Sequence, residues 1–137
     1  MSKPRRGVRW GWVFLGALLA EVALIPGAFV SGWIQTKLGW GIVGGYFLYS
    51  LLFFSILLPF GYWVAQKSDS SAILNGTLVG TVAALLFLPI LIWSPQSWGP
   101  DGPNYAMETV VSLSKVVGGS FGGFMAHRRK VFRGHAA

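Results

Sequence analysis

Two charged residues, Glu21 and Lys115, lie inside apolar stretches of the sequence, where charges are costly. Glu21 stands in GALLAEVALIPG, residues 16–27, and Lys115 stands in YAMETVVSLSKVVGGSFGGFMA, residues 105–126. A glutamate in such a position can carry a proton, or it can pair with a cation and specify which helices associate. Both kinds of chemistry are therefore open for Glu21.

The positions of the two charges in their segments favour an ion pair. Glu21 lies 12 residues after Arg9, and Lys115 lies 12 residues before His127, so the two have nearly the same depth if Arg9 and His127 share one membrane face. An unpaired charge at mid-membrane costs about 2.5–3.5 kcal/mol on insertion scales. We therefore predict that Glu21 pairs with Lys115 and that their helices pack together. With no chain of further carboxylates or histidines, a structural role is favoured over proton carrying.

The residues that share a helix face with these charges are small or polar, at about 100° per residue. On the last apolar segment this face holds Glu108, Ser112, Lys115, Gly119 and Gly122. On the first it holds Ala17, Glu21, Ala28, Gly32 and Gln35. Small residues permit close approach of helices in a membrane, so these faces are predicted to be packing surfaces.

Glycine spacing gives a second packing signal. Gly118 and Gly122, and likewise Gly119 and Gly123, form two overlapping G-x-x-x-G motifs, a spacing typical of closely packed membrane helices. The same spacing recurs at Gly41–Gly45 and Gly76–Gly80. In a chain with 19 glycines, this pattern indicates tight packing without naming the partner helix.

Composition indicates that lipid is the solvent of the elements that carry these residues. Of 137 residues, 53% are hydrophobic and 11% are charged, against about a quarter charged in soluble domains. Four apolar segments of about 20 residues or more predict an all-α polytopic membrane protein, a bundle of four transmembrane helices forming one membrane domain over residues 1–137. The predicted spans cover residues 10–34, 40–64, 72–93 and 105–126.

The distribution of basic residues predicts the orientation. Basic residues both precede the first apolar segment and follow the last one: Lys3, Arg5, Arg6 and Arg9, then Arg128, Arg129, Lys130 and Arg133. Four spans place both tails in the cytoplasm, in line with the positive-inside tendency, whereas three would separate them. We expect a multi-pass protein of the bacterial inner (plasma) membrane whose basic tails contact anionic head groups, not nucleic acid.

The residues available for other chemistry are few. The chain has no cysteine, and its two histidines, His127 and His135, lie in the basic C-terminal tail. No nucleophile–base pair or metal-ligand cluster is found within the apolar segments, so the sequence predicts no enzyme, no metal site and no cofactor. Asn75, Thr77 and Thr81 could join a polar interior, although hydroxyls in a span more often bond their own helix backbone.

Two resemblances add to this interpretation. GALLAEV, residues 16–22, resembles the first helix of small multidrug resistance transporters, four-helix proteins in which a helix-one glutamate binds protons and cationic drugs in turn. That resemblance implies that Glu21 is a proton and substrate site. The whole layout, closed by KVVGGSFGGFMAHRR, is similar to small uncharacterised four-helix bacterial inner-membrane proteins and implies a location.

Two functions therefore remain at the level of sequence. The favoured one is a small integral membrane protein without a catalytic site, an accessory or structural subunit of a larger membrane complex or a homo-oligomer, in which Glu21 and Lys115 join helices one and four. The alternative is a small proton-coupled transporter that uses Glu21 as its proton and substrate site.

Overall fold

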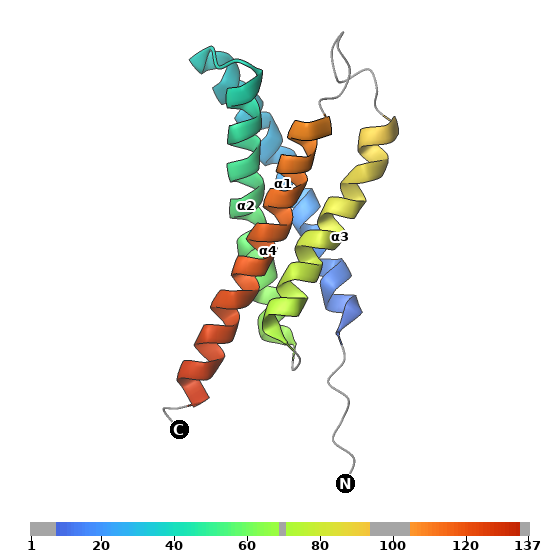
Figure 1. The fold of residues 1–137 in the computed structure, drawn as a ribbon, viewed down its shortest axis with the longest axis vertical. Helices are drawn as coiled ribbons and strands as arrows, with labels where there is room; N and C mark the ends of the chain where they lie inside the picture. Colours follow the sequence, from blue (N-terminus) through green and yellow to red (C-terminus); the bar gives the residue numbers. More distant parts are fainter. Residues whose placement is uncertain (1–7, 69–70, 94–104, 135–137) are drawn as a thin grey trace.

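The computed structural model describes residues 8–68, 71–93 and 105–134 and contains four α-helices in that part of the chain. They are α1 (Trp10–Leu38), α2 (Ile42–Lys67), α3 (Ala72–Trp93) and α4 (Tyr105–Gly134). Successive helices run antiparallel along a common long axis (Figure 1). The predicted all-α class and the four helices are confirmed.

The helices are longer than the predicted spans at several ends. Residues 35–38, expected in a turn, continue α1, because Gly39 closes the helix instead. Gly39 has a φ of 62°, a left-handed conformation that glycine adopts without strain, and its N–H group lies 3.4 Å from the Thr36 carbonyl oxygen. The turn into α2 is therefore short. At the C-terminal end of the last predicted span, α4 continues beyond residue 126 to Gly134.

Helices α2 and α3 each contact all three other helices, and the closest backbone approach in the bundle is that of α4 to both of them. Helix α4 packs against both α2 and α3, and α1 packs against both from the other side. The backbones of α1 and α4 hardly approach each other. The expectation that helices one and four pack directly together is therefore wrong at the level of the backbone, because α2 and α3 lie between them.

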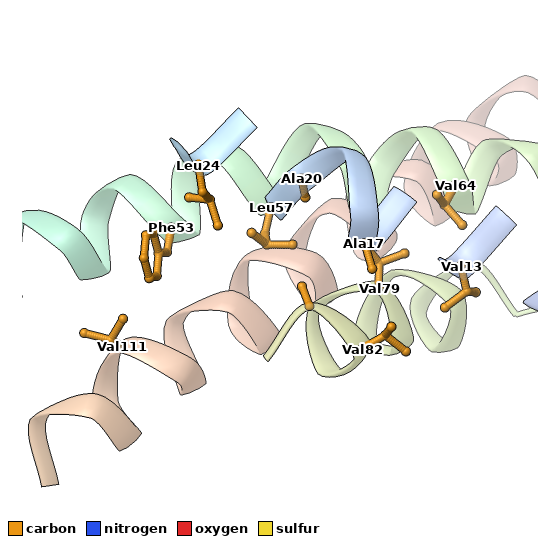
Figure 2. Packing of buried hydrophobic residues seen from close by; sticks show 11 residues of the cluster. Val13, Ala17, Ala20, Leu24, Phe53, Leu57, Val64, Val79, Val82 and Val111 are labelled. Carbon is orange, nitrogen blue, oxygen red and sulfur yellow. The ribbon is translucent and has the colours of Figure 1, made fainter. Parts of the chain in front are cut away.

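The hydrophobic core lies where α1 meets α2 and α3. Its α1 contribution is a narrow stripe of small and medium side chains, and α4 adds Val111 at the edge. Figure 2 shows this cluster, whose buried members are Val13, Ala17, Ala20, Leu24, Phe53, Leu57, Val64, Val79, Val82, Ala83 and Val111. The stripe predicted on α1 is rotated, since Ala20 and Leu24 are buried whereas Glu21 lies at its margin.

Much of the outer surface is apolar. The side chains of Phe29, Trp33 and Phe47 are 77%, 64% and 66% exposed. A soluble monomer rarely shows so much contiguous apolar surface, whereas membrane helices present it to lipid. By length and composition, three helical segments in the described chain could cross a membrane, namely Trp10–Leu38, Ile42–Lys67 and Ala72–Pro89. Helix α4 is too polar to meet the same criterion.

One end of the bundle is joined by hydrogen bonds from basic side chains. At the start of α1, the Arg9 guanidinium donates to the Lys67 carbonyl oxygen at 2.9 Å. Near the end of α4, the Lys130 ammonium donates to the carbonyl oxygens of Ala65 at 2.9 Å and Ser68 at 2.7 Å. The start of α1 and the end of α4 therefore lie at the same end of the bundle, beside the C-terminus of α2 (Figure 1).

Candidate functional site

The predicted ion pair between Glu21 and Lys115 is present. The Lys115 ammonium donates a hydrogen bond to Oε1 of Glu21, with 2.5 Å between the two atoms. The Lys115 side chain is 0% exposed, whereas that of Glu21 is 19% exposed. The two charges thus lie at one level of the bundle, as their positions in the sequence predict, and the ion pair joins α1 to α4.

Two aromatic rings complete the surroundings of the Lys115 ammonium. Its nitrogen lies 4.9 Å from the centre of the Phe53 ring on α2 and 4.6 Å from that of Phe87 on α3. A cation over an aromatic face is attracted by the negative face of the ring, and more strongly where water is excluded. Helices α1, α2 and α3 therefore each provide one side chain that contacts the Lys115 ammonium of α4.

The length of the lysine side chain explains how an ion pair forms between helices that do not pack together. The backbone of α4 at Lys115 lies against α3, where a Cβ atom at Gly80 would be 2.7 Å from the Val116 Cα atom. From there the four-carbon stem carries the ammonium between Phe53 and Phe87 toward α1.

Glu108 forms a second buried acidic position on α4. Its side chain is 7% exposed and lies beside the Tyr46 hydroxyl of α2. It also interacts electrostatically with Lys115, which lies two helical turns further along the same face. The sequence pattern places Glu108 on this face but gives no sign of Tyr46, which is one of several tyrosines in α2.

The remaining predicted site residues of α4 are Ser112 and the four glycines of the two G-x-x-x-G motifs. Ser112 is half-buried, beside the buried Val111. The two glycine motifs of α4 point toward different helices: Gly118 and Gly122 lie against the α2 backbone near Phe54 and Tyr62, and Gly119 and Gly123 lie against α3. The backbone of Gly119 also contacts Gly61 of α2.

The α3 partners of this second motif are themselves glycines. A Cβ atom at Gly119 would lie 2.9 Å from the Gly80 nitrogen, and one at Gly76 would lie 2.7 Å from the Gly123 Cα atom. Two G-x-x-x-G motifs therefore face each other across the α3–α4 contact. The Gly41–Gly45 spacing does not join helices in this way, since Gly41 precedes α2 in open space and Gly45 lies beside the Gln35 side chain.

Polar residues of α3 form a smaller set of interactions away from the ion pair. Thr77 and Thr81 donate to the carbonyl oxygens one turn earlier, at 2.9 and 3.0 Å, as expected for hydroxyls in a span. The Thr77 hydroxyl also lies 2.9 Å from that of Ser120 on α4. Asn75 donates to the Ser68 hydroxyl at 2.9 Å, and so connects α3 to the preceding turn.

The arrangement around Lys115 holds a fully buried positive charge against the Glu21 carboxylate. In the described residues, no group of three histidine, cysteine, aspartate or glutamate side chains is placed to hold a metal ion. Comparisons of the chain with models of protein families, with curated proteins and with solved structures found no match. The protein is thus characterised by its own geometry, a helical bundle with three apolar helices and a buried ion pair that joins α1 to α4.

Proposed function

We propose that this chain is a multi-pass, non-catalytic protein of the bacterial inner membrane that serves as an accessory or structural subunit. In this proposal α4 is the fourth span, with its polar and glycine-rich sides against α2 and α3 and an apolar side, including Val110, Leu113 and Val117, facing lipid, and both termini lie in the cytoplasm. The common location of the α1 start and the α4 end supports an even number of spans. The basic residues gathered at that end support the cytoplasmic assignment.

The observation that carries this proposal is the complete enclosure of the Lys115 ammonium. It contacts Glu21 directly, is flanked by Phe53 and Phe87, and is 0% exposed. A charge neutralised in this way links α4 to one group from each of the other three helices and can specify their arrangement. Such a device suits a protein whose task is to present a defined surface to a partner.

The surface available for a partner is apolar along the outer helices and basic at one end. Arg128 lies over the rings of Phe124 and Phe132, with its charge centre 6.0 and 5.7 Å from the ring centres. Stacking keeps this guanidinium at the edge of the apolar surface, where anionic lipid head groups lie in the cytoplasmic leaflet. We therefore expect the lipid bilayer, anionic head groups and a membrane complex or homo-oligomer as partners.

The test is purification at native expression level from the host in a mild detergent, with quantitative mass spectrometry of whatever remains bound. A subunit is expected to elute with a partner at a fixed stoichiometry that survives a second detergent. A Lys115→Met variant should lose that partner, because the helices are no longer held in one arrangement, whereas a Lys37→Met control should keep it. Elution of the native chain as a monomer would contradict the proposal.

A second candidate function, the proton-coupled transporter, is favoured by one specific observation. Glu21 is 19% exposed although its counter-ion is fully buried, so part of the Glu21 side chain is accessible from outside the bundle. In purified proteoliposomes with an imposed proton gradient, a transporter should take up a cationic probe such as ethidium, and Glu21→Gln should abolish the uptake. Uptake that is unchanged in Glu21→Gln, or absent from the parent protein, rules this function out.

A further inference from the structure

If both Glu21 and Glu108 were ionised, the charges of the cluster around Lys115 would not sum to zero. Lys115 supplies one positive charge, and Glu21 and Glu108 would supply two negative charges if both were ionised. The described ionisable side chains of the surrounding segments are Glu21 and Lys37 on α1, Tyr46 and Tyr49 on α2, none on α3, and Tyr105, Glu108 and Lys115 on α4. Lys37 is exposed at the end of α1 and Tyr side chains are neutral at pH 7, so one negative charge remains uncompensated.

The geometry assigns the single ammonium to Glu21 rather than to Glu108. Lys115 donates directly to Glu21 at 2.5 Å, whereas Glu108 lies two helical turns away along α4. Lysine side chains on a helix lean toward its N-terminus, so the Lys115 stem shortens this gap without closing it. The two rings on either side of the ammonium also hold it at the level of Glu21.

Glu108 is left with a neutral partner. The Tyr46 hydroxyl lies beside its carboxyl group, and the Glu108 side chain is 7% exposed. Burying an ionised carboxylate with no adjacent cation is among the most costly arrangements in a protein interior. Because Glu108 lies in the first turn of α4, the helix dipole offsets part of this cost, but with about half a charge shared over several N–H groups.

We propose that Glu108 is a proton-binding site: in the folded protein at neutral pH its carboxyl group is protonated and forms a neutral hydrogen-bonded pair with Tyr46. The bound proton supplies the positive charge that Lys115 cannot give to both acids. The cluster of Glu21, Lys115 and Glu108 is then neutral as a whole. This site is independent of which of the two functions above the protein performs.

Infrared spectroscopy of the purified protein in lipid tests this directly, because a protonated carboxyl group has a C=O stretching band that a carboxylate lacks. The chain has four acidic residues, so an Asp69→Asn/Asp101→Asn background leaves Glu21 and Glu108 as the carboxyl side chains. At pH 7 this background protein is expected to show one such band. In Glu108→Gln the band should disappear, since Glu21 then pairs with Lys115 alone.

Two tyrosine variants locate the proton. Tyr46→Phe removes the hydrogen bond to Glu108 and should move the band to higher frequency, whereas Tyr49→Phe on the same helix should leave it in place. Absence of the band from the background protein at pH 7 would overturn the proposal. So would its persistence in Glu108→Gln, or a frequency that Tyr46→Phe does not change, since the proton would then reside on Glu21.

Discussion

The Lys115 ammonium is completely removed from solvent, so its effect on stability depends on the protein groups that replace its water of hydration. Desolvation of an ammonium group costs several kcal/mol, and a direct ion pair with additional favourable contacts offsets that cost without a large surplus. Glu21 supplies the ion pair, and Phe53 and Phe87 supply the contacts. The net stabilisation is therefore small, but removal of one partner leaves the other charge uncompensated.

We expect Lys115→Met to lower the free energy of unfolding by about 3–5 kcal/mol, because Glu21 loses its counter-ion. The double variant Glu21→Leu/Lys115→Met should recover most of that loss, since no charge is then left in the interior. Unfolding in mixed micelles, followed by circular dichroism, measures both.

The matched control for this pair is Lys37→Met, an exposed lysine at the end of α1. It should change the unfolding free energy by less than about 0.5 kcal/mol. Additive effects of the Glu21 and Lys115 substitutions would show that the two side chains do not interact in the membrane.

At the scale of elements, helix packing depends on glycines that let backbones meet. In α4 the motif at Gly118 and Gly122 fits α2, and the motif shifted by one residue, Gly119 and Gly123, fits α3. A shift of one residue rotates the contact by about 100°, so overlapping motifs serve two neighbours on adjoining sides of one helix. This arrangement brings α2 and α3 close enough to α4 for the Glu108 and Lys115 side chains to be buried.

An added methyl group in this contact should be strongly destabilising. At Gly122 it would lie 2.7 Å from the Tyr62 nitrogen of α2, which is backbone and cannot move aside. We expect Gly122→Ala to cost at least the 1–3 kcal/mol typical of overpacking, measured by the same unfolding assay. Gly119→Ala should do the same at the α3 contact.

Gly11→Ala provides the control for the glycine prediction. A Cβ atom at Gly11 in α1 would meet nothing within 4 Å, so the change should be neutral or stabilise by up to about 1 kcal/mol through helix propensity. Equal effects of Gly11→Ala and Gly122→Ala would contradict the assigned packing.

At the scale of the whole molecule, the proposed topology of four antiparallel spans places the start of α1 and the end of α4 on one side of the membrane. The chain contains no cysteine, so single cysteines can report the side directly. In intact cells, a membrane-impermeant maleimide should label Thr36→Cys and should spare Gln66→Cys and His127→Cys. All three side chains are exposed. Labelling of Gln66→Cys and His127→Cys from opposite sides would show that α4 does not span.

The helices and the ion pair could be predicted from the sequence, for a physical reason. Apolar length sets where a helix crosses the bilayer, and the rise per residue converts position along the chain into depth. The positions of Glu21 and Lys115 along the chain therefore suffice to match their depths. The cost of isolated charges in lipid then makes them partners.

The order of the helices around the bundle was decided by the tertiary structure. A G-x-x-x-G motif permits close approach to any helix, so it did not show that Gly118 faces α2 while Gly119 faces α3. For the same reason the sequence did not reveal that α2 and α3 separate α1 from α4. Phe53, Phe87 and Tyr46 become part of the site only through that arrangement, because side chains distant in sequence meet where packing places them.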